Sequence, residues 1–314
     1  TDSDMTRVGI LVFDGMTLLD LSGPAEVLSR APGYEITLFS PTGGTVTAGN
    51  GLQVTGCVAP VSSGLDTVII TGADALPDGW DPALLHACST LAQGARRVAS
   101  ICTGAFLLAE LGLLDGRRAT THWRNARDLA RRYPRVRVEA DTLHVHDGKY
   151  LTSAGITAGI DLALSLVEED HGAAEARHIA QDMVVFMHRP GGQSQFADAA
   201  STVVDHPILR SVVESVHADP TGAHTVTSMA ESAAVSSRHL GRLFRDELGT
   251  TPAQWLEQFR LSTAQQLILD GHTITAAARN SGFGSDETLR RAFERRLHVT
   301  PTEYRARFSS TFRA

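Results

Sequence analysis

The strongest constraint on the fold is an internal repeat with a period of 49 residues in the last third of the chain. Its matched positions are Leu240 and Leu289, Arg242 and Arg291, Phe244 and Phe293, Leu248 and Leu297, Thr251-Pro252 and Thr300-Pro301, and Trp255 and Tyr304. In each copy the apolar residues recur with helical spacing and end at a Thr-Pro stop. The repeat therefore predicts an all-α domain built from two similar helical units.

Each copy has the layout of a helix-turn-helix. A serine that can cap a helix, Ser236 or Ser285, precedes the second helix of each copy. Arginines project from the polar faces of this helix in the first copy, at Arg238, Arg242 and Arg245. A helix of this kind presents polar side chains to the major groove of double-stranded DNA. One helix, over about 253–270, is expected to connect the two units.

The charge is unevenly distributed between this segment and the rest of the chain. Residues 221–314 hold 12 Arg against 9 acidic residues, so the total charge of −7 is +3 from this segment and −10 from the remainder. A slightly basic segment on an acidic body indicates two functions, one of which involves an anionic partner. The alternative for the arginines is a solvated helix face, but the duplicated helix-turn-helix favours DNA binding.

The second helix of each unit supplies the candidate DNA contacts. Arginine can bind guanine in bidentate fashion, threonine can contact the thymine methyl group, and a carboxylate can accept from cytosine N4. The candidates for base reading are Arg238, Arg242, Ser285, Asp286, Glu287, Thr288 and Arg291. The candidates for phosphate contacts or solvated positions are Arg245, Arg290, Arg295 and Arg296.

The first 190 residues alternate between strand and helix signals. Strands are expected at 7–13, 34–40, 67–70 and 97–101, followed by a hairpin that turns at Asp147-Gly148. Helices are expected at 18–29, 82–93, 103–114, 156–170 and 173–187. This alternation predicts an α/β sandwich with a mostly parallel sheet. The segment His188–Ala200, with a proline and two glycines, is expected to end the domain.

Cys102 is the most specific candidate for a functional residue in the first half. It lies between a predicted strand end and a predicted helix start at Thr103-Gly104, the layout of a nucleophile elbow. The helix N-terminus is expected to lower the pKa of the thiol. Backbone N–H groups near Gly72 and Thr103 could form an oxyanion hole. The alternative is a small residue that is merely buried at the turn.

Other residues of the first half allow weaker interpretations. His122 could line the same pocket or be a structural histidine, and Ser153 could close one pocket wall or simply begin a helix. His144 and His146 alternate on a strand, but with no third ligand nearby a solvated strand is favoured over a metal site. Neither glycine pair, Gly43-Gly44 or Gly191-Gly192, fits a phosphate loop. The sequence thus predicts no metal and no cofactor.

Cysteine usage and hydropathy predict a cytoplasmic protein. The three cysteines are odd in number and have neither CxxC nor metal-type spacing, which indicates a reducing compartment. No run of about 18 apolar residues is present, so no membrane span is expected. The N-terminus lacks the charged and apolar regions of a signal peptide.

The motifs resemble two known families. The blocks MAESAAVSSRHLGRLFRDELGTTPAQW and ARNSGFGSDETLRRAFERRLHVTPTEY resemble the AraC/XylS DNA-binding domain, with His298 where that family usually has glycine. The blocks LVFDGMTLLDLSGPAEVL, VASICTGAFLLAELGLLDGRRATTHW and TSAGITAGIDLAL resemble the ThiJ/PfpI superfamily, which has a glutamine-amidotransferase-like fold. Together the two are similar to GlxA-type transcriptional regulators.

The resemblance implies a division of the chain and a function. It implies a flavodoxin-like ligand-sensing domain over 5–190, a linker and helix over 191–220, and a DNA-binding domain over 221–308. Asp20 stands where the superfamily places a carboxylate beside the cysteine. The implied function is a regulator that dimerises through its N-terminal domain, binds operator DNA, responds to a small-molecule effector and is not an enzyme. The alternative is a cysteine-dependent hydratase or amidase like the isocyanide hydratases, with an accessory DNA-binding domain.

Overall fold

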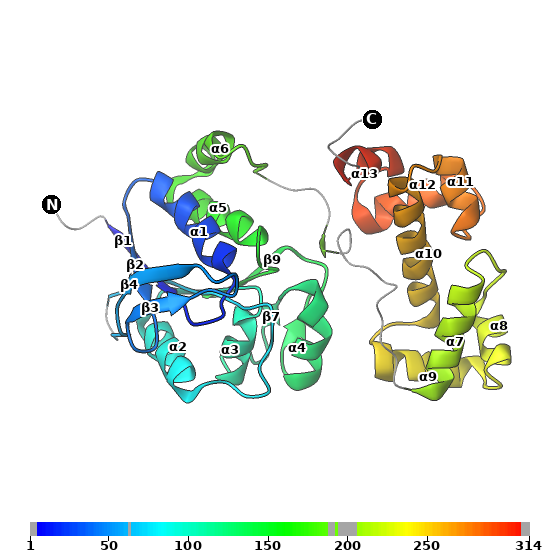
Figure 1. Ribbon diagram of the computed structural model, residues 1–314, viewed down its shortest axis with the longest axis horizontal. Helices are drawn as coiled ribbons and strands as arrows, with labels where there is room; N and C mark the ends of the chain where they lie inside the picture. The colour runs from blue at the N-terminus through cyan, green and yellow to red at the C-terminus, as the bar shows by residue number, and fades with distance from the viewer. Residues whose placement is uncertain (1–4, 62–63, 188–191, 194–205, 309–314) are drawn as a thin grey trace. The chain divides into compact units, whose positions relative to one another are not determined.

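The computed structural model describes residues 5–61, 64–187, 192–193 and 206–308 (Figure 1). The chain divides into two compact units, 1–189 and 190–314. Most of the segment 188–200, which we expected to end the first domain, lies outside the described residues. Each unit is described by itself below.

The first unit is built on a six-stranded sheet with the order β2-β1-β5-β6-β10-β9. Its strands are β1 (Thr6–Leu11), β2 (Tyr34–Phe39), β5 (Thr67–Ile70), β6 (Arg97–Ile101), β9 (His144–Asp147) and β10 (Tyr150–Ser153). All neighbours pair in parallel except β9 with β10, which form the predicted hairpin. The predicted flavodoxin-like fold with a mostly parallel sheet is confirmed.

Helices cover both faces of this sheet (Figure 1). The hydrophobic core on one face includes residues of α1 (Leu18–Arg30), α5 (Ala158–His171) and α6 (Ala173–Asp182), of which α6 packs on α5. The core on the other face includes residues of α2 (Pro82–Gly94), α3 (Gly104–Glu110) and α4 (Ala126–Arg132). The side chains of the central strand β5 account for the helices on both faces. Ile69 points into the first core while Val68 and Ile70 point into the second, so an uninterrupted apolar run is buried on both sides.

Several elements differ from the sequence-based expectations. Helix α6 ends at Asp182 rather than near 187, because Val184 adopts a left-handed conformation with φ 57° and reverses the chain. Helix α3 ends at Glu110 rather than near 114, shortly before Gly112 with φ 70°. The elements that we did not predict are β3 (Gly44–Thr47), β4 (Gln53–Cys57), β7 (Arg118–Ala119), β8 (Arg137–Val138), the 3-10 helix η1 (Trp123–Asn125) and α4.

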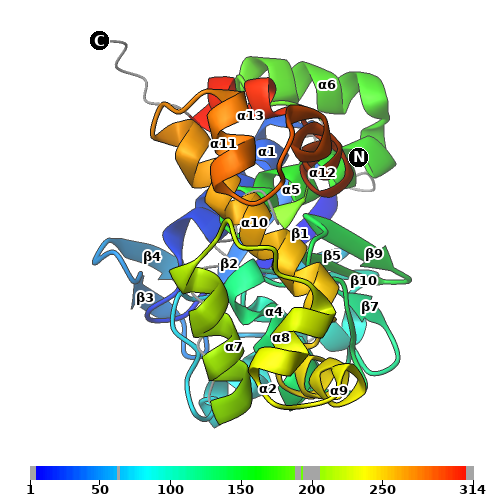
Figure 2. The same ribbon diagram turned by 90° about the vertical axis from the view of Figure 1, so that its right-hand side faces the viewer.

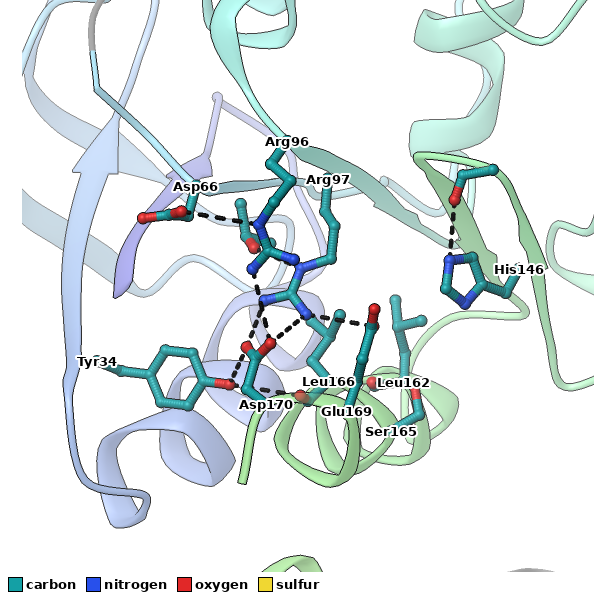
Figure 3. A network of polar contacts seen from close by, with 12 residues as sticks. Tyr34, Asp66, Arg96, Arg97, His146, Leu162, Ser165, Leu166, Glu169 and Asp170 are labelled. Carbon is teal, nitrogen blue, oxygen red and sulfur yellow. Dashed lines mark hydrogen bonds and ion pairs between the residues drawn. The ribbon is translucent and has the colours of Figure 1, made fainter. Parts of the chain in front are cut away.

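A buried ionic network fixes the amino end of β6 to the carboxyl end of α5 (Figure 3). Arg97 is 3% exposed, and its guanidinium donates to both carboxylate oxygens of Asp170. The Tyr34 hydroxyl donates to the same carboxylate at 2.6 Å. Burial raises the pKa of Asp170, but these hydrogen bonds outweigh it and hold the pKa below the usual value. The carboxylate is therefore charged, and the helix is pinned to the sheet.

The second unit is entirely helical in its described part and has two hydrophobic cores. Its helices are α7 (Pro207–Ala218), α8 (Val226–Ser232), α9 (Ser237–Leu248), α10 (Pro252–Leu269), α11 (Ile274–Asn280), α12 (Asp286–Leu297) and α13 (Pro301–Phe308). Helix α7 contributes Leu209 and Val212 to the first core. Helix α10 contributes Phe259 to the first core and Leu261 to the second, so one continuous helix runs between the two helix-turn-helix units (Figure 2).

The two units repeat each other in their helix ends. Ser236 and Ser285 cap α9 and α12 by accepting from the backbone N–H three residues later. Both helices end at a left-handed residue, Gly249 with φ 63° in the first unit and His298 with φ 56° in the second. A left-handed residue lets the chain leave the helix, and at His298 it costs about 1–2 kcal/mol because a β-carbon is present.

Candidate functional site

Cys102 lies at a tight turn between β6 and α3. It has φ 55°, a left-handed conformation that is strained for any residue with a β-carbon, and it is 3% exposed. Its N–H donates to the Ser153 carbonyl at 3.0 Å, and its own carbonyl accepts from Thr121 Oγ1 at 2.7 Å. The turn is thus held from both sides, and the predicted elbow is present.

Three glycines allow neighbouring loops to converge on this turn. A β-carbon at Gly155 would lie 2.2 Å from Cβ of Cys102. One at Gly72 would lie 2.5 Å from the Thr103 nitrogen, and one at Gly104 would lie 2.5 Å from the Ile70 carbonyl oxygen. Real β-carbons do not approach so closely, so these positions require glycine. The close packing of this site therefore depends on three glycines as well as on Cys102.

Asp20 joins two of these loops through its carboxylate. It is 0% exposed on α1, and its oxygens accept from the N–H groups of Ile156 at 2.8 Å and Gly72 at 3.0 Å. Burial raises the pKa of Asp20 to about 6, against the opposing effect of these two hydrogen bonds. The Gly72 N–H, which we expected in an oxyanion hole, is therefore already used by Asp20.

The expected lowering of the Cys102 pKa is wrong. Burial raises the pKa of the thiol well above its usual value, and the nearby Asp20 carboxylate raises it further. Helix α3 is only seven residues long, and the hydrogen bonds from Thr103 at its start lower the pKa by less than burial and Asp20 raise it. The thiol is accordingly protonated near neutral pH in this conformation, which is unlike an activated nucleophile.

The other predicted residues of this site have identifiable partners. Thr103 Oγ1 accepts from the Ala73 N–H at 2.7 Å and donates to the Ala73 carbonyl at 2.8 Å. Ser153 Oγ accepts from the Gly155 N–H at 3.3 Å. His122 accepts from the Arg124 N–H through Nδ1 at 3.3 Å, and burial and Arg124 lower its pKa. The structure thus gives His122 a capping role.

Thr121 is a residue of this site that sequence reasoning missed. It is fully buried and bonds directly to the Cys102 backbone, whereas we had singled out its neighbour His122. The sequence signal for Thr121 was the threonine pair Thr120-Thr121 directly before His122. Among the described residues, no group of three or more His, Cys, Asp or Glu side chains could hold a metal ion. His146, which we weighed as a metal ligand in the sequence, bonds to the Gly148 carbonyl at 2.9 Å.

Helix α9 presents a cationic hollow of about 360 Å³ in the first helix-turn-helix. The residues that line it are Ser236, Arg238, His239, Arg242 and Arg245. Arg242 Nη2 lies 3.1 Å from His239 Nδ1, and all three arginines are exposed. None of these arginines forms an ion pair with any residue that the structure describes. Their charges are therefore free to meet an anionic partner.

Helix α12 carries its charges differently. Glu287 pairs with Arg290 at 3.0 Å and with Arg291 at 2.7 Å, and Arg290 also pairs with Glu294 at 2.6 Å. These hydrogen bonds lower the pKa of Glu287 below its usual value. Glu287, Arg290 and Arg291, which we proposed as DNA contacts, are thus paired within the helix in the free protein, and Glu294 completes the network.

The remaining predicted DNA contacts on α12 have structural partners. Thr275 Oγ1 donates to Asp286 at 2.7 Å, which ties α11 to α12. Ser285 Oγ lies 2.8 Å from Thr288 Oγ1 while it caps the helix. These side chains remain exposed, but each already has a hydrogen-bond partner within the protein.

Arg295 and Arg296 have a role that we did not predict. Both pair with Glu257 on α10, with an Arg296 Nη2 to Glu257 Oε2 distance of 2.7 Å. Burial raises the pKa of Glu257, but the two arginines outweigh it and hold the pKa below the usual value. These residues therefore tie α12 to the connecting helix in the free protein, and Arg295 also remains exposed, as expected for a solvated position.

Among the residues that the structure describes in either unit, no helix is both long and apolar enough to span a membrane.

Comparison with known proteins identifies both units. The DJ-1/PfpI family matches residues 6–169, and a helix-turn-helix domain family matches residues 229–307. The HTH-type transcriptional regulator CdhR of Pseudomonas aeruginosa is 31% identical, with 94% of this chain and 89% of that protein covered. The HTH-type transcriptional regulator GlxA of Rhizobium meliloti is 31% identical, with 98% of each covered. An isonitrile hydratase of Pseudomonas putida is 36% identical over 65% of this chain and 90% of that protein.

Solved structures support the same fold for the first unit. A THiJ/PfpI family protein from Pseudomonas syringae superposes with a TM-score of 0.52 at 24% identity, covering 73% of this chain and 89% of that one. The hydratase matches 65% of this chain, whereas the two regulators match 94% and 98% of it and so reach into both units. The chain therefore belongs to the family of HTH-type transcriptional regulators in which a DJ-1/PfpI domain precedes an AraC-type helix-turn-helix domain.

Proposed function

We propose that this regulator reads operator DNA through α9 and α12 and that its first unit senses a small-molecule effector in the cytoplasm. The observation that carries the proposal is the pair of helix-turn-helix units joined by the single helix α10. A continuous helix can hold two reading helices at a fixed separation, as binding in successive major grooves requires.

The base-reading residues that we propose are Arg238 and Arg242 on α9 and Arg291 on α12. The first two are exposed beside the cationic hollow, one helical turn apart. Such arginines can bind guanine O6 and N7 at once. Arg245 and Arg290 are proposed to contact phosphates, which position a protein without reading sequence.

For the first unit we propose a sensing pocket around the Cys102 turn, with Asp20, Thr103, His122 and Ser153. A homodimer through this unit would place two DNA-binding units on one operator. Cys102 is 3% exposed, and burial raises the pKa of its thiol. Both facts support sensing over turnover, because a nucleophile needs an accessible thiolate. Hydratase activity is the second candidate, since an isonitrile hydratase is 36% identical over 65% of this chain.

Binding titrations on a selected operator and on scrambled DNA test these roles. We expect Arg242→Ala and Arg291→Ala each to cost about 1–3 kcal/mol on the operator and to relax preference at one base. On scrambled DNA both variants should lose far less. Equal losses on both DNAs would contradict base reading.

The same titration tests the sensing role. Cys102→Ser should leave the DNA affinity of the ligand-free protein unchanged, because the thiol lies in the other unit. Purified protein should hydrate no simple isonitrile to the formamide, while the hydratase relative serves as the positive control. Isonitrile hydration by the wild-type protein that is lost in Cys102→Ser would instead favour the hydratase alternative.

A further inference from the structure

The two reading helices carry opposite charges at two of three matched positions. The 49-residue period places Arg238 opposite Glu287 and Arg245 opposite Glu294, while Arg242 matches Arg291. These positions are spaced i, i+4 and i+7, so they share one face of each helix. The face is Arg-Arg-Arg on α9 and Glu-Arg-Glu on α12. The two similar units thus present differently charged faces to DNA.

The contacts within each helix reinforce this difference. On α12, Glu287 holds Arg290 and Arg291 at 3.0 and 2.7 Å. On α9, no described carboxylate pairs with the three arginines, and the contact that Arg242 makes is with His239 at 3.1 Å. The arginines of α9 are ready to bind DNA, whereas Arg291 must first leave Glu287, and Arg290 must leave both Glu287 and Glu294.

This arrangement has a consequence for binding to DNA of any sequence. Non-specific affinity comes from arginine and lysine contacts to phosphates, which release counterions. An arginine that is held by Glu287 gives up an existing partner when it moves to a phosphate, and the carboxylate is then left facing the polyanion. Only a matched set of base contacts offsets that loss.

We propose that α9 supplies most of the affinity for DNA and α12 most of the selectivity, with Glu287 as the specificity-determining residue. Glu287 acts by withholding Arg291, and together with Glu294 also Arg290, from phosphates until a cognate base sequence is present. This inference rests on the proposed reading of DNA by both helices.

A structural role for Glu287 would have a different signature. An acidic residue in the first turn stabilises a helix through its dipole by about 0.3–1 kcal/mol. Asp286 and the Ser285 cap remain in a Glu287 variant, and Glu287 is exposed. The fold of α12 should therefore survive the substitution, which far-ultraviolet circular dichroism can verify.

The experiment compares full-length wild type with Glu287→Gln and Glu287→Arg on operator and scrambled DNA over a range of salt concentrations. The matched control is Asp246→Asn, which removes one exposed negative charge from α9 without releasing any arginine from a described pair. We expect Glu287→Gln to bind scrambled DNA about tenfold more tightly at low salt and to steepen the slope of log K against log salt by about 0.9 per added phosphate contact.

Operator affinity should change much less, so the ratio of operator to scrambled affinity falls. Glu287→Arg, which gives α12 the residue that α9 has at the matched position, should lower this ratio further. Asp246→Asn should shift both affinities by the same small factor.

Two results would overturn the inference while leaving DNA reading intact. One is weaker operator binding by Glu287→Gln with scrambled binding unchanged, which would make Glu287 a direct base contact. The other is equal behaviour of Glu287→Gln and Asp246→Asn. A wild-type protein that does not distinguish operator from scrambled DNA would instead refute the proposed function itself.

Discussion

Replacing Leu261 with proline is expected to abolish operator binding by both helix-turn-helix units. Leu261 is 0% exposed near the middle of α10, where its side chain belongs to the second core. Proline removes one backbone hydrogen bond and clashes with the preceding turn, at a cost of about 3 kcal/mol or more. Because α10 also contributes to the first core, a break here changes the separation of α9 and α12.

The measurement is a titration on the operator together with far-ultraviolet circular dichroism. Leu261→Met is the control, since it keeps both the helix and the approximate volume and should cost under about 1.5 kcal/mol of stability. Wild-type operator affinity in the proline variant would show that α10 does not set the geometry of the two units.

Replacing Gly155 with alanine is expected to disrupt the Cys102 turn. The new β-carbon would lie 2.2 Å from Cβ of Cys102, and Gly155 has φ 90°. Overpacking costs about 1–3 kcal/mol, and the positive φ adds about 1–2 kcal/mol. Hydrogen exchange should therefore accelerate in β6 and β10 and remain unchanged in α9 and α12.

Gly116→Ala separates the two causes. Gly116 also has a positive φ, 71°, but nothing lies within 4 Å of its added β-carbon. This control should show the conformational cost without the steric one. Equal protection in both variants would mean that Cys102 and Gly155 are not in the tight contact described above.

The strands of the central sheet could be predicted from sequence because their signals are local. The runs 67–70 and 97–101 were expected as strands, and β5 and β6 have those bounds. The hairpin β3–β4 was missed because its short strands contain glycine and exposed polar residues. The end of α6 was missed because a left-handed Val184 has no signal in a sequence, unlike a glycine.

The candidate sites could be located from sequence, but their energetics could not. The strand-to-helix turn pointed to Cys102, and the repeat pointed to α9 and α12. The raised pKa of Cys102 depends on burial and on Asp20, a residue 82 positions away in the chain. The pairing of Arg296 with Glu257 likewise depends on how α12 packs against α10. Such long-range contacts leave no local pattern.

The central claim is that two helix-turn-helix units on one helix read adjacent segments of the same DNA. The most direct measurement is a hydroxyl-radical footprint of the full-length protein on DNA selected from a random library. We expect two short protected elements for each chain, separated by about 10 base pairs on one face of the helix. Protection of a single element, or selection of no common sequence, would contradict it.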